Sequence, residues 1–191
     1  IRIAGIITHR RYRSFNELHI EGSEIIRSLP DTNVLFISNH PTYFADVVAM
    51  FHVFNASLKG RENNIKNVLY LWNPKLNLYY VAAKETMQEG LLPRILAYAG
   101  AITVERTWRA KGKDVTEKKE VNPNDTENIK IALEDGWVIT FPQGTTRSFK
   151  PVRKGTAHII LQHKPIVVPI VIDGFRRSFD RKGLRIKKKG I

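Results

Sequence analysis

The chain has 191 residues, of which 42% are hydrophobic and 26% charged, a composition typical of a folded domain long enough to bury a core. Its 31 Lys and Arg outnumber its 18 Asp and Glu, and the net charge of +13 favours an anionic partner: nucleic acid, an acidic membrane surface or a phosphate-bearing substrate. The absence of cysteine excludes disulfides, thiolate metal sites and a cysteine nucleophile.

The first thirty residues mix isoleucines with a basic patch that contains Arg10, Arg11 and Arg13. Such a stretch can lie on a membrane interface or cover the core as a solvated edge, and the second interpretation is favoured. No apolar run approaches the roughly 20 residues that cross a bilayer. The chain starts at Ile1 rather than Met and stops within a lysine run, so we expect residues 1–191 to be a single domain, truncated at one or both ends.

An apolar, partly β-branched run at residues 34–37 predicts a buried strand, and the apolar run at 47–54 predicts a helix buried all round. Between them lie His40 and Asp46. Proline favours the first helical turn, so we expect a helix that starts near Pro41, with His40 just outside it and Asp46 inside it. A carboxylate that holds the imidazole in one tautomer would make His40 a general base. The alternative is a polar turn histidine followed by an ordinary early-helix acid.

The middle of the chain alternates further strands and helices. A strand at 79–83 and a helix near 91–98 precede a glycine turn at Gly100, a strand at 101–104 and Arg106 at its end. Residues 107–124 are lysine-rich without periodicity, which predicts a long surface excursion. A helix should start at Asp125 or Thr126 and stop at Gly136, with one apolar face made of Ile129, Ala132 and Leu133.

A strand at 137–141 leads into a loop rich in hydroxyls and backbone donors at 142–148. A helix through 159–161 follows Lys154 and Gly155, and a last strand at 166–172 contains Pro169, which predicts a sheet edge or a bulge. Alternating strands and helices predict an α/β domain, a mostly central β-sheet flanked by helices, with loops at the strand ends forming the site.

Four blocks in order resemble the glycerolipid acyltransferases of the 1-acylglycerol-3-phosphate acyltransferase family. That family carries Asn-His-x4-Asp, a Gly-x5-Arg type block, Phe-Pro-Glu-Gly-Thr-Arg-Ser and a Val-Pro-Ile/Val strand. The matching residues here are Asn39, His40 and Asp46; Gly100 and Arg106; Phe141, Pro142, Gln143, Gly144 and Thr145; and Val168, Pro169 and Ile170. The resemblance covers the motif-bearing core, residues 34–174, and implies an acyltransferase-like αβ fold.

Three departures from that pattern stand out. Five residues separate His40 from Asp46 where the family has four, an insertion that a loop absorbs at little cost when its ends stay in place. Gln143 replaces a glutamate, which removes a charge but keeps an acceptor and adds donors. Thr146 is either inserted before Arg147 or stands in place of the family's arginine, so Arg147 is an alternative source of that guanidinium.

The resemblance implies transfer of a fatty acyl group from a thioester, on coenzyme A or acyl carrier protein, to a hydroxyl of a lysophospholipid. His40 would be the general base and Asp46 its orienting partner, with no cofactor and no metal. Arg106, Gln143, Gly144, Thr145 and Arg147 would bind the acceptor phosphate, although Arg106 beside Glu105 could equally form a surface salt bridge. Gly144 and Thr145 could instead bind the oxyanion or simply form a tight turn that only glycine permits. Asn39, Gly100, Phe141, Pro142 and Pro169 would support the site architecturally. His52 and His158 sit in apolar segments and are expected to be core residues with a bonded nitrogen.

The positive surface would hold the protein on the cytoplasmic face of an anionic membrane as a peripheral protein, through the basic patch and residues 185–189. Two alternatives remain open. A nucleic-acid-binding protein would explain the charge, but the chain lacks an aromatic RNA platform, zinc-finger spacing or a helix-turn-helix pattern. An acyltransferase acting on a lyso-aminolipid without a phosphate would explain the altered third block.

Overall fold

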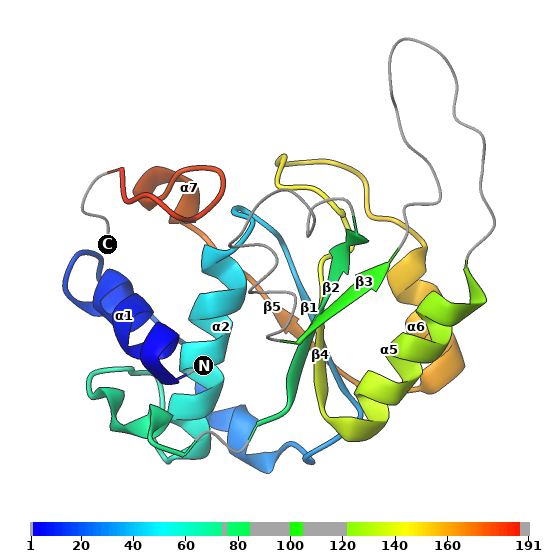
Figure 1. Ribbon diagram of the computed structural model, residues 1–191, viewed down its shortest axis with the longest axis horizontal. Coiled ribbons are helices and arrows are strands. Elements are labelled where there is room, and N and C mark those ends of the chain that lie inside the picture. The colour runs from blue at the N-terminus through cyan, green and yellow to red at the C-terminus, as the bar shows by residue number, and fades with distance from the viewer. Residues whose placement is uncertain (1, 74–75, 85–99, 105–121, 188–191) are drawn as a thin grey trace, which may run out of the picture.

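Five strands form one parallel sheet in the order β3-β2-β4-β1-β5 (Figure 1). The computed structural model describes residues 2–73, 76–84, 100–104 and 122–187. Its strands are β1 Val34–Ser38, β2 Leu78–Ala83, β3 Ala101–Val104, β4 Trp137–Thr140 and β5 Ile166–Ile170. Its helices are α1 Arg2–Arg13, α2 Ala45–Leu58, α5 Pro123–Asp135, α6 Gly155–His163 and α7 Phe175–Ser178, with 3-10 helices η1 Ser23–Ser28 and η2 Val68–Leu71. The predicted α/β class with a central sheet flanked by helices is confirmed.

Helices cover both faces of this sheet. Helix α2 lies against one face, α5 and α6 lie against the other, and α1 packs on the outer side of α2 (Figure 1). Strands covered on both faces are apolar throughout rather than alternating. Val34, Leu35 and Phe36 of β1 are completely buried, as their continuous apolar run predicted.

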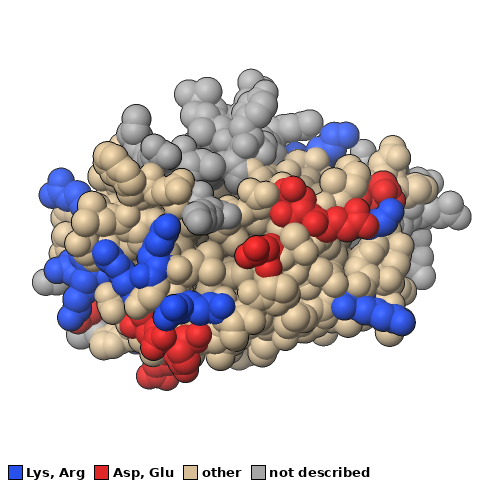
Figure 2. All heavy atoms as spheres, turned by 90° about the horizontal axis from the view of Figure 1, so that it is seen from below, with Lys and Arg blue, Asp and Glu red and all other residues tan. Residues whose placement is uncertain are grey.

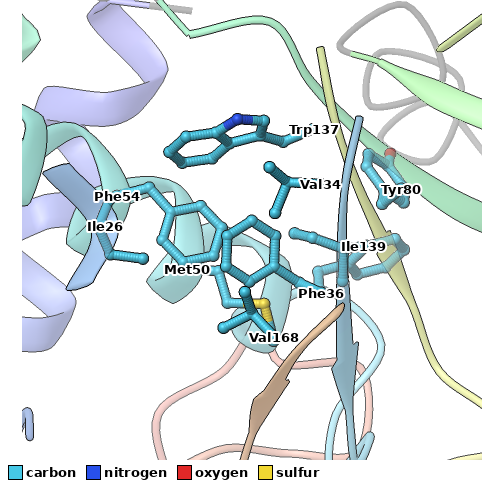
Figure 3. Packing of buried hydrophobic residues seen from close by; sticks show 10 residues of the cluster. Ile26, Val34, Phe36, Met50, Phe54, Tyr80, Trp137, Ile139 and Val168 are labelled. Carbon is cyan, nitrogen blue, oxygen red and sulfur yellow. The ribbon is translucent and has the colours of Figure 1, made fainter. Parts of the chain in front are cut away.

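The core between α2 and the sheet is built around aromatic rings (Figure 3). Phe36 of β1 stacks on Phe54 of α2 with ring centroids 4.3 Å apart, and Trp137 of β4 lies 5.4 Å from Phe36. The Trp137 indole N–H donates to the carbonyl of Pro30 at 2.7 Å, so its polar atom is satisfied. Complete burial of a large apolar side chain contributes about 1.5–3 kcal/mol, and here it fixes the strand that ends just before His40.

Helix α2 starts at Ala45 and not near Pro41, so that prediction was wrong. The reason is a contact with a distant segment. The amide N–H groups of Tyr43 and Phe44 donate to the carbonyls of Arg181 and Lys182, both at 3.1 Å, which holds residues 41–44 as an irregular turn. The helix itself is apolar on nearly every side, as predicted, because α1, η1 and η2 cover the faces that the sheet does not.

Helix α5 also starts earlier than predicted, at Pro123 instead of Asp125 or Thr126. Asn122 is its N-cap, with the side-chain oxygen accepting from the amide of Asn124 at 3.0 Å, and proline occupies the first helical position where its missing N–H is harmless. The predicted excursion at 107–124 therefore ends within this helix. Outside the described residues lie residues 107–121 of that stretch, the predicted helix at 91–98 and Arg106.

Strand β5 is at the edge of the sheet, which confirms the placement predicted from Pro169. The strand ends at Ile170 and not at Ile172. At the opposite edge, Gly100 has a φ of +102°, and a Cβ there would lie 2.4 Å from the carbonyl oxygen of Leu78. Only glycine lets the chain enter β3 so close to β2, so Gly100 supports the sheet rather than a ligand.

The N-terminal stretch forms α1, whose inner face covers α2. Tyr12 is buried, and its hydroxyl donates to the carbonyl of Ala45 at 2.8 Å. His52 is also buried, as predicted, and both its ring nitrogens are bonded. His158 is exposed on α6, so its predicted place in the core was wrong. Among the described residues, no helix has the length and apolar character needed to span a membrane.

Candidate active site

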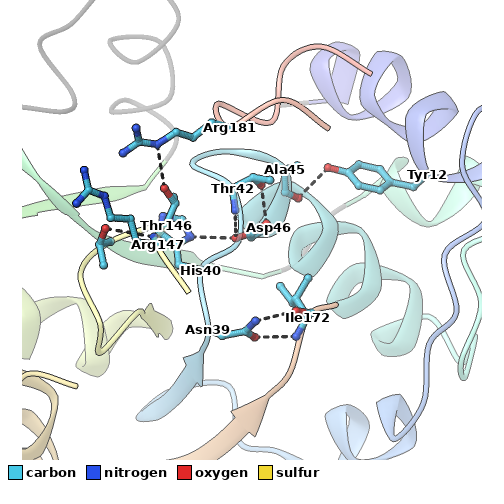
Figure 4. Close-up of polar contacts among 11 residues, drawn as sticks. Tyr12, Asn39, His40, Thr42, Ala45, Asp46, Thr146, Arg147, Ile172 and Arg181 are labelled. Carbon is cyan, nitrogen blue, oxygen red and sulfur yellow. Dashed lines mark hydrogen bonds and ion pairs between the residues drawn. The ribbon is translucent and has the colours of Figure 1, made fainter. Parts of the chain in front are cut away.

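The predicted pair of His40 and Asp46 lies just beyond the end of β1, the strand next to the edge strand β5 (Figure 4). Strand β1 runs between β4 and β5, so the segments that follow all three strands meet at the same edge. In parallel α/β sheets, ligands bind outside the carboxyl ends of the strands. The topology therefore puts the motif residues of three separate blocks in one place.

His40 and Asp46 are in direct contact. The imidazole Nδ1 lies 3.0 Å from Oδ2 of Asp46. The Asp46 side chain is completely buried, and it also accepts from the Thr42 amide at 3.0 Å and from the Thr42 hydroxyl at 2.6 Å. A buried carboxylate with three donors is held in one position, so it can fix the orientation of the ring that it contacts.

The extra residue between His40 and Asp46 is accommodated in the turn at 41–44, before the helix begins. Thr42 makes this possible because its amide and hydroxyl both bind the same carboxylate. Thr42 was not predicted as a site residue. The only signal for it in the sequence is a hydroxyl residue four positions before the aspartate, which is too common to stand out.

Two aromatic side chains also pack against the His40 ring. Phe141, which follows β4, stacks on it with centroids 3.9 Å apart, and Tyr43 meets it edge-on at 6.1 Å. The His40 side chain keeps 12% of its surface accessible. Within the described residues, nothing forms a hydrogen bond with Nε2. A ring held by Asp46 through Nδ1 presents Nε2 as a proton acceptor towards solvent or substrate.

Asn39 has a structural role next to the histidine. Its side-chain amide donates to the carbonyl of Ile172 and its oxygen accepts from the Ile172 amide, both at 2.7 Å. These two bonds extend the pairing of β1 with β5 by one side chain beyond the end of both strands. Asn39 therefore fixes the backbone from which His40 projects, as expected for a supporting residue.

The loop after β4 folds into a turn that already uses some of the predicted donors. The Gly144 amide donates to the carbonyl of Phe141 at 2.8 Å, so it is not free for an anion. The side-chain amide of Gln143 donates to the carbonyl of Lys150 at 2.8 Å. The Pro142 carbonyl accepts from the backbone amide of Arg153, also at 2.8 Å. Gly144 has a φ of +58° and packs against the Arg153 guanidinium, only 3.0 Å from where a Cβ would lie.

The two hydroxyl residues of this loop differ. The Thr145 hydroxyl accepts from the Arg147 amide at 3.3 Å and retains its own proton for donation, while the Arg147 side chain is exposed. Thr146, which is either inserted before Arg147 or stands in place of the resembled family's arginine, is buried, and its hydroxyl accepts from Nε of Arg181 at 3.2 Å. Sequence reasoning missed Arg181, which lies far along the chain from both segments that it contacts.

Among the described residues, no group of three or more His, Cys, Asp or Glu side chains is arranged to hold a metal ion. The groups gathered at the site suit a different chemistry. A base oriented by a buried carboxylate can take a proton from an alcohol, and guanidinium and hydroxyl groups beside it can bind an anion.

Comparison with known proteins agrees with the four sequence blocks. A 1-acyl-sn-glycerol-3-phosphate acyltransferase from Cocos nucifera is 26% identical over 179 residues, which make up 92% of this chain and 47% of the relative. This chain therefore spans about half the length of that relative. No solved structure gives a significant match. The model of the Acyltransferase family matches residues 17–173, more than three quarters of the chain, and includes every described residue of the site except Arg181. The chain belongs to the Acyltransferase family.

Proposed function

We propose that this protein transfers a fatty acyl group from an acyl thioester to the free hydroxyl of a lysophospholipid, with lysophosphatidate as the acceptor and phosphatidate as the product. The observation that carries the proposal is the contact between Nδ1 of His40 and the buried Asp46, which leaves Nε2 accessible. The family match and the name of the Cocos nucifera relative support the same reaction class.

In this reaction Nε2 of His40 takes the proton of the acceptor hydroxyl as its oxygen attacks the thioester carbonyl carbon. Asp46 stabilises the positive charge that forms on the ring. The tetrahedral intermediate then collapses, the carbon–sulfur bond breaks, and the proton passes from His40 to the leaving thiolate. A thioester is already activated, so no acyl-enzyme and no cofactor is needed, and either coenzyme A or acyl carrier protein can carry the acyl group.

The test is thiol release from palmitoyl-coenzyme A and from a palmitoyl carrier-protein thioester, with and without lysophosphatidate. We expect acceptor-dependent release by the parent chain, and a loss of about 10²- to 10⁴-fold in His40→Ala because a general base contributes that much. Asp46→Asn should also lose most activity, since an amide cannot balance the charge on the imidazolium.

His158→Ala is the matched control, because His158 is exposed on α6 and its side chain forms no hydrogen bond with a described residue of the site. It should keep the parent rate, and circular dichroism should show that all the variants fold. Full activity in His40→Ala would refute the assignment of the base. Faster transfer to a lyso-aminolipid than to lysophosphatidate would instead identify an acceptor without a phosphate.

We also place the protein at the cytoplasmic face of a membrane as a peripheral protein, where both substrates and product would lie. On α1, Ile6 and Ile7 are exposed and are followed by the exposed Arg10 and Arg13, a combination suited to an anionic lipid interface. The face seen in Figure 2 carries acidic side chains interspersed with the basic ones, so the positive excess does not extend evenly over it. Flotation with neutral and anionic vesicles tests this proposal, and equal binding to both kinds would contradict it.

A further inference from the structure

Arg181 belongs to a segment that follows the family-matched region and is attached to the turn that carries His40. The carbonyls of Arg181 and Lys182 accept the amides of Tyr43 and Phe44, both at 3.1 Å. Gly183, with a φ of +77°, packs so close that a Cβ there would lie 2.5 Å from the Ala45 amide nitrogen. The backbone of Arg181 is thus fixed relative to the start of α2.

Asp180 fixes the backbone of residues 180–185 through its own side chain. Its carboxylate accepts the amides of Leu184 at 2.8 Å and Arg185 at 3.0 Å. Burial raises the pKa of the Asp180 carboxyl, but the backbone donors of Arg185, Leu184 and Gly183 outweigh it and leave the pKa below its usual value. The carboxylate is therefore occupied in holding the turn and is directed at backbone amides.

The Arg181 side chain is aimed by two further contacts near the histidine. Its Nε donates to the buried Thr146 hydroxyl at 3.2 Å (Figure 4). Its Nη2 donates to the Tyr43 hydroxyl at 3.1 Å. The guanidinium carbon lies 5.5 Å from the centre of the Tyr43 ring, whose own centre lies 6.1 Å from that of His40. One aromatic ring therefore separates the guanidinium from the imidazole.

This cation has unused binding capacity. Arginine carries five N–H donors, and the two contacts above account for one donor each. The part of the chain that the structure describes offers no carboxylate within ion-pair distance of Arg181, and the side chain is exposed. A fixed guanidinium with free donors, and with no carboxylate partner among the described residues, is suited to a phosphate, which it can bind through two parallel hydrogen bonds.

We propose that Arg181 binds a phosphate group of the substrate while His40 acts on the acceptor hydroxyl. This inference rests on the proposed acyl transfer and names one residue of its acceptor site. Two substrates carry phosphate, the lysophosphatidate acceptor and the coenzyme A donor. Because the hydroxyl that His40 deprotonates and the phosphate of lysophosphatidate belong to the same small glycerol unit, the acceptor is the source that the geometry favours.

The test is Arg181→Gln, which removes the charge but keeps much of the side-chain stem. With lysophosphatidate we expect KM to rise about ten- to a hundredfold, as for the loss of a hydrogen bond to a charged group. With 1-monoacylglycerol, which has no phosphate, KM should not change. Arg181→Lys should lie between Gln and the parent, because an ammonium keeps the charge but not the planar pair of donors.

Arg177→Gln is the matched control. Arg177 is an exposed arginine on α7 that faces Asp173 at 3.9 Å, and it should keep the parent KM for both acceptors. A fall of kcat that is equal for both acceptors in Arg181→Gln, with KM unchanged, would show a structural role and overturn the proposal. Thermal melting of each variant provides the check on folding.

Two further arms separate the possible results. If KM rises for palmitoyl-coenzyme A but not for palmitoyl N-acetylcysteamine, the bound phosphate is the donor's, and phosphate binding by Arg181 still holds. If the parent transfers no acyl group, the proposed function fails, and calorimetry with hexanoyl lysophosphatidate decides the inference independently. Weaker binding by Arg181→Gln than by the parent supports it, and equal affinity overturns it.

Discussion

Thr42 supplies two of the three hydrogen bonds that hold the Asp46 carboxylate, and it is completely buried. Thr42→Val keeps the shape but removes the hydroxyl that donates to Oδ1 at 2.6 Å. We expect the free energy of unfolding to fall by about 1–3 kcal/mol, because a buried acceptor is left without its donor. Acyl transfer should fall as well, since a less restrained carboxylate orients His40 less well. Urea denaturation and thiol release measure the two effects.

Ser28→Ala is the control for this substitution, because the Ser28 hydroxyl also donates to one acceptor, the carbonyl of Ile25, but in an exposed position. It should change the stability by less than about 0.5 kcal/mol. If Thr42→Val were as stable and active as the parent, the hydroxyl would have no part in placing Asp46.

At this scale the sequence predicts the residue types of the site better than their individual contacts. His40 and Asp46 are brought together as expected, because one short turn joins the end of β1 to the start of α2. The use of the Gly144 amide inside its own turn, and the contact of Arg181 with a tyrosine 138 residues away, depend on how distant segments pack. Such contacts leave no local pattern, since a turn amide or a surface arginine looks the same wherever it points.

Helix α1 is attached to α2 by a buried polar network around His52. Thr8 donates its hydroxyl proton to the carbonyl of Gly5, so its oxygen accepts from Nε2 of His52 at 2.9 Å. Nδ1 must then accept from the Tyr70 hydroxyl, also at 2.9 Å. Burial, helped by the neighbouring His9, lowers the pKa of His52 to about 3, so the ring remains neutral in the folded protein.

This network predicts acid sensitivity. In the unfolded chain histidine takes up a proton near its usual pKa of about 6.5, whereas folded His52 does so only near pH 3. The unfolded state therefore binds more protons between these values. The stabilisation is fully present above pH 6.5 and is lost as pH falls, by about 1.4 kcal/mol per pH unit for this one group. Urea denaturation at pH 7.5, 6.0 and 5.0 measures the slope.

His52→Gln should be less stable at pH 7.5 and should lose this part of the slope, while His158→Gln, at an exposed position, should keep it. Parallel slopes for the parent and His52→Gln would show that His52 is protonated in the folded state. The Tyr12 hydroxyl of α1 also donates to the carbonyl of Ala45, the first residue of α2. Weaker attachment of α1 should therefore also make the position of the neighbouring Asp46 less fixed.

Strands were easier to predict than helix starts for a physical reason. A strand covered on both faces is marked by its own apolar run, as in β1 and β4. The edge strand that contains Pro169 carries a similar apolar run, although its Ile166 and Val167 are exposed. A helix start depends on which groups bind the first amides. For α2 these are the carbonyls of Arg181 and Lys182, which no pattern near Pro41 can reveal. For α5 the signal of Asn122 before Pro123 was present but was masked by the acidic residues that follow.

Across the whole molecule, the N-terminal helix α1 and the C-terminal segment that starts at α7 lie side by side next to α2 (Figure 1). Both segments are outside the region that the family model matches. Tyr12 of α1 lies 6.1 Å from Phe175 and 5.7 Å from Phe179, measured between ring centroids. The Arg11 guanidinium donates to the carbonyl of Leu184. These contacts join α1 and the segment after α7 into one layer. That layer packs against the start of α2 through Tyr12 and through the carbonyls of Arg181 and Lys182. Residues on both sides of the family-matched region therefore pack against it.

Phe179 tests this arrangement because it combines burial with a position two residues before Arg181. Only 1% of its surface is exposed, and Phe179→Ala should lower the free energy of unfolding by about 3–5 kcal/mol through the cavity that it leaves. Phe149→Ala is the matched control, since that ring is 99% exposed and its loss should change stability by less than about 0.5 kcal/mol. Urea denaturation of both variants gives the comparison.

Where Phe179→Ala still folds, its KM for lysophosphatidate should rise because Arg181 loses its support. A stable variant with an unchanged KM would mean that the segment after α7 is only loosely attached and that the family-matched region keeps its shape alone.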